Sequence, residues 1–190
     1  MRPNKLAVIE WARRTLQSNA VILDTETTGL DRYAEAIQLS IIDTQGNTLF
    51  DSLLRPVRPP APESIRIHGL TADRLQLAPP LLEMIEQVRR LLTNRNVVIY
   101  NAAFDLRILA QSCEAHGLAS DWIRALAPHC DCLMERYAIY HGERRRNGGY
   151  KWQPLPAGDH SALGDAQATL ALLQRIADTS TERQTWTARV

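Results

Sequence analysis

The segment Val21–Leu30 reads VILDTETTGL, a short apolar run that leads into two acidic residues and a turn. Side chains two residues apart on a strand point to the same face, so Asp24 and Glu26 share one side of the expected strand. Gly29 lets the backbone turn away and pass close to a ligand. The acidic pair alone is weak evidence for a site, because acidic residues are mostly solvated. Its meaning depends on acids elsewhere in the chain.

Outward from this segment, Ala36–Ile42 and Thr48–Leu54 predict two strands joined by a turn at Gln45–Asn47. Val97–Tyr100 predicts a further buried strand, and the proline-rich passage Arg55–Glu63 predicts a surface loop. Helices are expected over residues 5–17, from about 72, and over 81–92, 104–117, 129–141 and 161–177. Strands followed by alternating helices and a strand predict the α/β class, a mixed sheet flanked by helices.

The composition fits one domain over residues 1–190, with its motif-bearing part at about 19–178 and a helix at 5–17 in front. The 22 basic and 21 acidic side chains nearly cancel, so attraction to phosphate must be local. Three cysteines favour a reducing cytoplasm, and Cys130 and Cys132 are expected on a helix face instead of in a zinc site. Without a leader or a long apolar run, we expect a soluble cytoplasmic protein with no membrane attachment.

Asp105 ends the segment Asn101–Asp105 (NAAFD), which follows the Val97–Tyr100 strand and opens a helix. The helix dipole stabilises an acid in a first turn by about 0.3–1 kcal/mol, which by itself would explain this residue. Its position favours a second role. Asp24 and Asp105 both lie at or just past the carboxyl end of a buried strand, where open α/β sheets place their ligands.

The segment His160–Ala166 (HSALGDA) leads into a helix whose apolar face places Asp165 beside the core. A partly buried carboxylate is costly unless a cation receives it. Residues five apart differ by about 140° on a helix, so His160 and Asp165 meet one site only if His160 lies on the loop before the helix. Ser161 is a suitable N-cap for that break.

The four acids, brought together, would carry a formal charge of −4, and like charges in one pocket favour protonation unless cations fill it. Two divalent cations balance that charge. Oxygen ligands suit Mg²⁺ or Mn²⁺, and two such ions about 3.5–4 Å apart clamp the attacking and leaving oxygens of a phosphoryl displacement. The sequence therefore predicts a two-metal hydrolysis site.

With these residues in view, the chain resembles the DEDDh 3′→5′ exonucleases. This DnaQ-like superfamily includes the proofreading subunit of bacterial DNA polymerase III, exonuclease X, ribonuclease T and oligoribonuclease. The matching segments lie within residues 21–173: Val21–Leu30, Ile67–Thr71 (IHGLT), Asn101–Asp105 and His160–Ala166. The resemblance implies an RNase H-like mixed sheet of about five strands. It also implies that two metal ions are held by Asp24, Glu26, Asp105 and Asp165, with His160 as the general base.

The implied activity is 3′→5′ hydrolysis of terminal phosphodiester bonds in single-stranded DNA or at DNA 3′ ends, with release of nucleoside 5′-monophosphates. The expected pocket for the terminal nucleotide consists of Thr25, Thr27, Leu30, His68, Asn101 and Phe104. Two of these residues have an open structural alternative, Phe104 as plain core and His68 as a residue that holds its loop.

Two rival functions stay open at this point. One is an exonuclease acting on RNA or oligoribonucleotides through the same site, since no motif reads a 2′-hydroxyl. The other is an inactive nucleic-acid-binding scaffold with the same fold. The sequence does not decide whether the protein forms a homodimer or associates with a polymerase.

Two features depart from the family pattern, Tyr100 and the short segment at about 150–160. Many relatives have histidine where Tyr100 stands, and the short segment before His160 argues against a helix there. Arg144–Arg146 and Lys151 form one dense basic cluster beside Tyr150 and Trp152, which suggests a path for single-stranded nucleic acid. The alternative is a solvated loop with a buried tryptophan.

Overall fold

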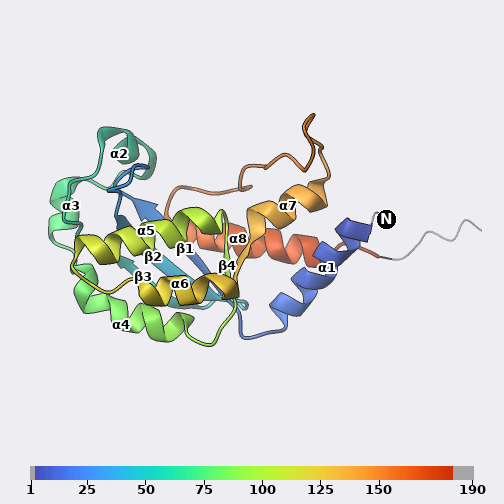
Figure 1. The fold of residues 1–190 in the computed structure, drawn as a ribbon, viewed down its shortest axis with the longest axis horizontal. Coiled ribbons are helices and arrows are strands. Elements are labelled where there is room, and N and C mark those ends of the chain that lie inside the picture. Colours follow the sequence, from blue (N-terminus) through green and yellow to red (C-terminus); the bar gives the residue numbers. More distant parts are fainter. Residues whose placement is uncertain (1–2, 182–190) are drawn as a thin grey trace, which may run out of the picture.

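A five-stranded mixed sheet forms the centre of the computed structural model, which describes residues 3–181 (Figure 1). Its strands lie in the order β3-β2-β1-β4-β5, with β1 (Val21–Thr27), β2 (Ala36–Asp43), β3 (Thr48–Leu53), β4 (Val97–Ile99) and β5 (Cys130–Cys132). The central strand β1 pairs antiparallel with β2 and parallel with β4. The predicted α/β class and the mixed sheet of about five strands are confirmed.

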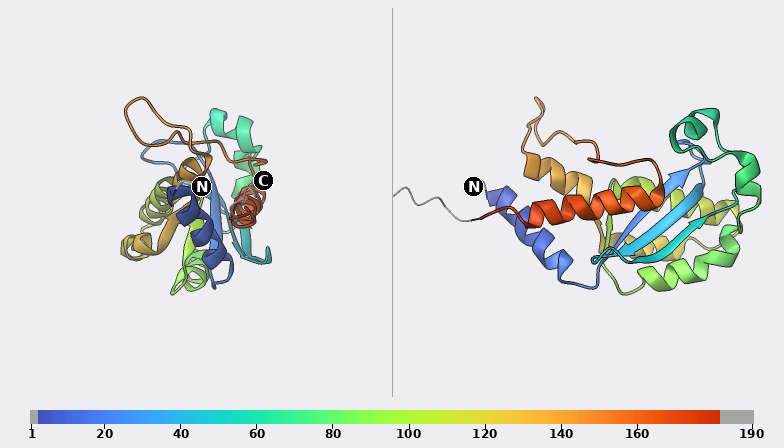
Figure 2. Two further views of the ribbon diagram at one scale, coloured as in Figure 1. Left: turned by 90° about the vertical axis from the view of Figure 1, so that its right-hand side faces the viewer. Right: turned by 180° about the vertical axis from the view of Figure 1, so that it is seen from behind.

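Helices cover both faces of the sheet (Figure 2). One face carries α4 (Leu81–Leu92), α5 (Ala102–Ala115) and α6 (Asp121–Leu126), and the other carries α1 (Pro3–Leu16), α7 (Leu133–His141) and α8 (Ala162–Ala177). Alternation along β1 divides the core, because Leu23 packs with the first group and Ile22 with the second. Two short helices, α2 (Pro62–His68) and α3 (Ala72–Gln76), lie beyond the carboxyl end of β1.

Three elements differ from the sequence prediction. Helix α2 begins inside the predicted proline-rich loop, because Pro62 occupies its first turn, where a missing N–H costs nothing. Helix α6 was not predicted. Strand β5 replaces the start of the helix predicted over 129–141, so the prediction that Cys130 and Cys132 lie on a helix face was wrong. This three-residue strand forms because its backbone pairs with the edge of β4.

Strand β1 also extends further than the apolar run suggested. It continues to Thr27, so Asp24 and Glu26 lie within the strand and not just past its end. Their partners on β2 are Ser40 and Gln38. The pairing with β4 covers only Val21 and Ile22, so β2 alone pairs with the backbone of the two acids.

The N-terminal helix α1 packs against the end of the molecule formed by α7 and α8. Trp11 Nε1 donates to Asp131 Oδ2 at 3.0 Å, and Arg13 Nε donates to the carbonyl of Ala177 at 2.8 Å. Between residues 3 and 181, no helix combines the length and apolar character needed to cross a bilayer. The predicted domain limits also include residues 1, 2 and 182–190, which lie outside the described residues.

Candidate active site

Asp24 and Glu26 project from β1 toward the side of the sheet that α8 covers. Ile22, two residues earlier, packs in the core shared with α8, and side chains alternate along a strand. Asp24 is buried, with 8% of its surface exposed, whereas Glu26 is partly exposed. The central strand thus carries one buried and one accessible carboxylate on the same face.

Asp165, in the first turn of α8, joins these two acids in a compact group. One carboxylate oxygen from each of Asp24, Glu26 and Asp165 lies within 4.8 Å of the others. Asp165 Oδ1 also accepts the backbone N–H groups of Asp159 at 2.9 Å and His160 at 3.3 Å. The loop before α8 is therefore bound directly to an acid of the group.

Asp105 approaches from the opposite face of β1. It lies in the first turn of α5 with 3% of its surface exposed, and its Oδ1 accepts the hydroxyl of Thr25 at 2.8 Å. Thr25 alternates with Asp24 and so points toward α5. Asp105 still lies near enough for its charge to raise the pKa of Asp24, after the larger effect of burial. Among the described residues, the compact group therefore holds three of the four predicted acids, with Asp105 beside it.

Burial and mutual repulsion disfavour the charged forms of these acids. The pKa of Asp24 lies well above its ordinary value because of burial and then the charges of Asp105, Asp165 and Glu26. Burial, followed by the charge of Asp165, raises the pKa of Glu26 to about 7. Burial also raises the pKa of Asp105. Clustered hard oxygen donors with this unrelieved repulsion fit a divalent cation, because its charge would remove the repulsion.

His160 lies on the loop directly before α8, as predicted. Ser161 caps the helix, since its Oγ accepts the N–H of Gly164 at 3.1 Å. His160 is exposed and adopts a left-handed backbone with φ of 61°, a conformation that costs a non-glycine residue about 1 kcal/mol or more. Its side chain lies near His68, whose pKa is lowered by burial and, to a lesser extent, by the charge of His160.

A cavity of about 500 Å³ lies beyond the end of β1, and its lining includes none of the four acids. Thr27, Leu30 and His68, three of the predicted substrate residues, line it together with Tyr33 and Ile67. Leu30 is 78% exposed, so its side chain offers an apolar surface that no protein group covers. Its lining combines apolar side chains with a few polar ones, as is common in pockets for small molecules.

His68 has both ring nitrogens engaged within the protein. Nδ1 accepts the N–H of Leu70 at 3.0 Å, so Nε2 carries the proton and donates to the carbonyl of Thr27 at 3.2 Å. The structure therefore favours the role of holding the loop. His68 shapes the cavity by fixing the backbone of Thr27.

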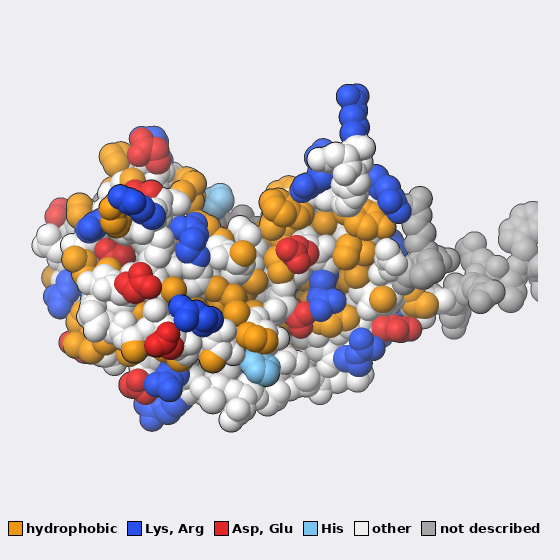
Figure 3. Space-filling view, in the orientation of Figure 1, with side chains coloured by type: hydrophobic (Ala, Val, Ile, Leu, Met, Phe, Trp, Pro, Cys, Tyr) orange, Lys and Arg blue, Asp and Glu red, His pale blue; other side chains and the backbone are white. Residues whose placement is uncertain are grey.

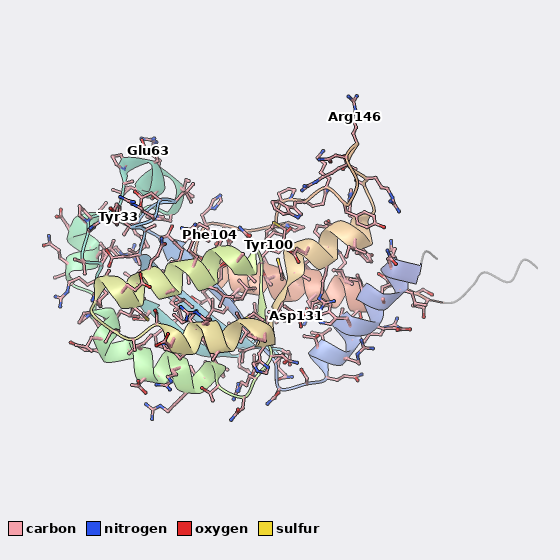
Figure 4. The ribbon with its side chains drawn as sticks, in the orientation of Figure 1. Tyr33, Glu63, Tyr100, Phe104, Asp131 and Arg146 are labelled. Atoms are coloured by element: carbon pink, nitrogen blue, oxygen red, sulfur yellow. The ribbon has the colours of Figure 1, made fainter. Side chains whose placement is uncertain are left out.

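Asn101 and Phe104 lie apart from that cavity, at the start of α5. Asn101 has a left-handed backbone with φ of 73° and makes no side-chain cap. Phe104 is half-buried against the core, and the guanidinium carbon of Arg107 lies 5.1 Å from its ring centre. Figure 4 shows Phe104 and Tyr100 near one another, between α2 and the segment that carries Arg146. The predicted substrate residues thus form two groups.

Glu35 has a positioning role that the sequence reasoning missed. It is 1% exposed, and its carboxylate accepts the backbone N–H groups of Val57 at 2.9 Å and Arg58 at 3.0 Å. Its backbone N–H donates to Thr28 Oγ1 at 2.9 Å. Glu35 therefore ties the proline-rich loop to the end of β1 and fixes one wall of the cavity. An isolated acid before an apolar strand gave no signal of this role.

The comparisons with known proteins agree with this geometry. The profile of a family described as Exonuclease matches residues 21–173. The chain belongs to the exonuclease family. The predicted kinship with DnaQ-like 3′→5′ exonucleases is thereby confirmed, and so is a metal-dependent nuclease in place of the inactive scaffold.

Two curated relatives differ greatly in length. The chain is 33% identical over 182 residues to the uncharacterized exonuclease CP81 of Escherichia phage 186, covering 90% of this chain and 94% of the relative. It is 28% identical over 180 residues to the PolC-type DNA polymerase III of Bacillus subtilis strain 168, covering 90% of this chain. The chain spans only 12% of the length of that polymerase.

Solved exonucleases share the fold. Exonuclease I of E. coli in complex with a dA16 oligonucleotide superposes with a TM-score of 0.63 at 18% identity, covering 85% of this chain and 42% of that one. Exonuclease X in complex with 5′ overhanging duplex DNA gives a TM-score of 0.58 at 24% identity, covering 86% and 94%. The sheet and helices described above are therefore the exonuclease fold.

Proposed function

We propose that this exonuclease removes nucleotides from the 3′ ends of single-stranded DNA by two-metal catalysis and releases nucleoside 5′-monophosphates. The observation that carries the proposal is the convergence of oxygens from Asp24, Glu26 and Asp165 within 4.8 Å. With Asp105, these acids carry a formal charge of −4, which two Mg²⁺ or Mn²⁺ ions neutralise. Nucleic acid ends are the proposed substrate because the family to which the chain belongs is described as Exonuclease.

The residues divide into two roles. Asp24, Glu26, Asp105 and Asp165 hold the two ions, which when bound lower the pKa of a water toward ~7 and neutralise charge on the leaving oxygen. His160 accepts the proton of the attacking water, since its side chain is exposed to solvent and lies on the loop beside the acids. The bond from the backbone N–H of His160 to Asp165 Oδ1 keeps the base next to the acids.

The substrate is bound on both sides of the acids. Leu30 offers its exposed side chain to the terminal base, and the backbone of Thr27, fixed by His68, follows the sugar and phosphate. Asn101 and Phe104, at the start of α5, contact the nucleic-acid strand. The proposal that the substrate is a nucleic-acid strand with a free end is supported by the oligonucleotide in the exonuclease I structure and by the overhanging duplex in the exonuclease X structure.

One gel tests the proposal. Single-stranded DNA with a 5′ label is incubated with Mg²⁺, with EDTA, and with Mg²⁺ and the Asp24→Asn variant. Stepwise shortening from the 3′ end is expected in the first lane alone, and chromatography of its products should show nucleoside 5′-monophosphates. Internal cuts, or equal activity with EDTA, would refute the proposal. A matched RNA strand degraded faster than the DNA would replace DNA by RNA as the substrate.

A further inference from the structure

Residues 143–152 form a projecting hairpin, here named the basic hairpin. Arg144 pairs with Tyr150 in an antiparallel bridge, and the backbone N–H of Lys151 donates to the carbonyl of Glu143 at 2.9 Å. Gly148, with φ of 92°, makes the turn in a backbone conformation that suits glycine. Figure 4 shows Arg146 at the tip, pointing away from the body of the protein.

The charge of the basic hairpin is not balanced within the described chain. Lys151 Nζ is paired with Glu143 Oε1 at 3.0 Å, but between residues 3 and 181 no carboxylate pairs with Arg144, Arg145 or Arg146. All three arginines are exposed. Adjacent like charges repel one another, and the binding of an anion such as a phosphate would relieve this repulsion.

Aromatic rings lie among these arginines. The guanidinium of Arg144 lies 5.2 Å from the ring centre of Tyr150, and that of Arg145 lies 4.8 Å from the ring centre of Trp152. Trp152 is 55% exposed, so the sequence alternative of a buried tryptophan was wrong. Guanidinium groups that bind phosphates beside rings that stack on bases match the chemistry of a single nucleic-acid strand.

The residue just after the basic hairpin is hydrogen-bonded to the residue that follows β4. Tyr100, directly after β4, donates its hydroxyl to the carbonyl of Gln153 at 2.7 Å. From there the chain crosses to His160 and α8, beside the end of β1 (Figure 1). Figure 3 shows a hollow in the surface between the α2 side and the hairpin, with apolar side chains at the foot of the hairpin and basic ones above them.

We propose that the basic hairpin binds single-stranded nucleic acid on the 5′ side of the terminal nucleotide, because its unpaired arginines and exposed tryptophan lie on the segment that leads directly to His160 and Asp165. This inference rests on the proposed function. The hairpin touches no reacting atom. It raises affinity for long strands and leaves cleavage of the terminal bond unchanged.

The test compares two triple variants with the same change of charge. In the hairpin variant Arg144, Arg145 and Arg146 become glutamine. In the control variant Arg89, Arg90 and Arg124 become glutamine; these exposed residues lie on α4 and α6, far from the hairpin in Figure 1. Substrates are a 30-nucleotide thymidine strand and the p-nitrophenyl ester of thymidine 5′-monophosphate, which is too short to reach the hairpin.

The hairpin variant should raise KM for the 30-nucleotide strand by about tenfold or more with little change in kcat, and should leave both constants for the ester unchanged. Loss of three phosphate contacts should also reduce the slope of log KM against log salt concentration by about 2. The control variant should behave as the unaltered protein. An unchanged KM for the strand, or an equal rise in both variants, would overturn the inference.

Binding separates this inference from the proposed function. Fluorescence anisotropy with a labelled 30-nucleotide strand, in the Asp24→Asn background, measures affinity without cleavage. The hairpin change should weaken binding of the strand about tenfold, and the control change should not. Weakened binding of a blunt duplex with unchanged binding of the single strand would overturn the assignment to single strands. If the unaltered protein cleaves neither substrate, the proposed function fails, whereas the anisotropy result still decides the role of the hairpin.

Discussion

Asp24 and Glu26 lie on the central strand of the sheet, whereas His160 lies on an exposed loop with a left-handed backbone. The strand acids repel one another, and the pairing of β1 with β2 along its whole length holds their backbone in place. A proton acceptor has the opposite requirement, because it must reach water and exchange protons with it. The comparison teaches that the acids are coupled to the stability of the fold and that the histidine is not.

The largest expected effect tests the strand side of this comparison. Asp24→Asn keeps the shape of the side chain and removes a charge, so kcat should fall by at least about 10³-fold. In EDTA at pH 8 the same variant should melt at a higher temperature than the unaltered protein, since repulsion with Asp105, Asp165 and Glu26 is relieved. Single-turnover kinetics and calorimetry measure the two effects. Lower thermal stability together with lost activity would indicate simple misfolding.

Asp43→Asn is the matched control at the other end of the sheet. Slight burial raises the pKa of Asp43, but hydrogen bonds from Asn47 and neighbouring backbone groups together lower it below its ordinary value. Removing this charge should therefore reduce the melting temperature and leave kcat unchanged. The two substitutions should move stability in opposite directions, and a shift in the same direction would break the comparison.

The next largest effect tests His160 on the loop before α8. His160→Gly suits the left-handed backbone and should lower kcat by about 10²–10⁴-fold, the usual contribution of a general base. Added imidazole should restore part of the activity because the site is exposed. The melting temperature should stay within about 2 °C of the original value, because an exposed substitution has a small effect on stability. Activity within twofold of the original, at every pH, would remove His160 from the mechanism.

The dependence of stability on pH should distinguish the strand acids from the loop as well. The pKa of Glu26 is about 7 in the folded protein and about 4.3 when unfolded, so the folded state binds more protons in that window. Its stabilising contribution is present below about pH 4.3 and is lost as pH rises through about 7. In EDTA the melting temperature should therefore fall between pH 5 and 8. Mg²⁺ should flatten this dependence, and a flat curve in EDTA would contradict the raised pKa of Glu26, which burial and then the charge of Asp165 produce.

The smallest effect concerns the cavity. Leu30→Ala removes the proposed apolar contact of this exposed side chain with the terminal base, a loss of about 1 kcal/mol in binding free energy. KM for single-stranded DNA should therefore rise about fivefold, with kcat and melting temperature unchanged. Leu77→Ala is the control, since Leu77 is 91% exposed and does not line the cavity. Steady-state kinetics on the two variants measure the difference. An equal KM for both would exclude Leu30 from base binding.

Strong apolar periodicity made several elements predictable. Helix α4 begins after Pro80 and buries residues at spacings of three and four, and α8 begins after its Ser161 cap. Weak local signals explain the elements that were missed. The three residues of β5 are a strand only because β4 offers an edge, and α2 starts at a proline in a proline-rich passage. Tertiary pairing decided these short elements, so local propensity could not.

The sequence by itself was enough to single out the side chains that are proposed to carry the chemistry. Asp24 and Glu26 share a face because side chains alternate along a strand. Ser161 places His160 outside α8 because an N-cap marks the residue before a helix begins. Only the tertiary structure decided how these residues meet. It groups Asp165 with the β1 acids and leaves Asp105 bonded to Thr25 on the other face. Such distances depend on how distant segments pack across the sheet, and spacing along a chain carries no information about that packing.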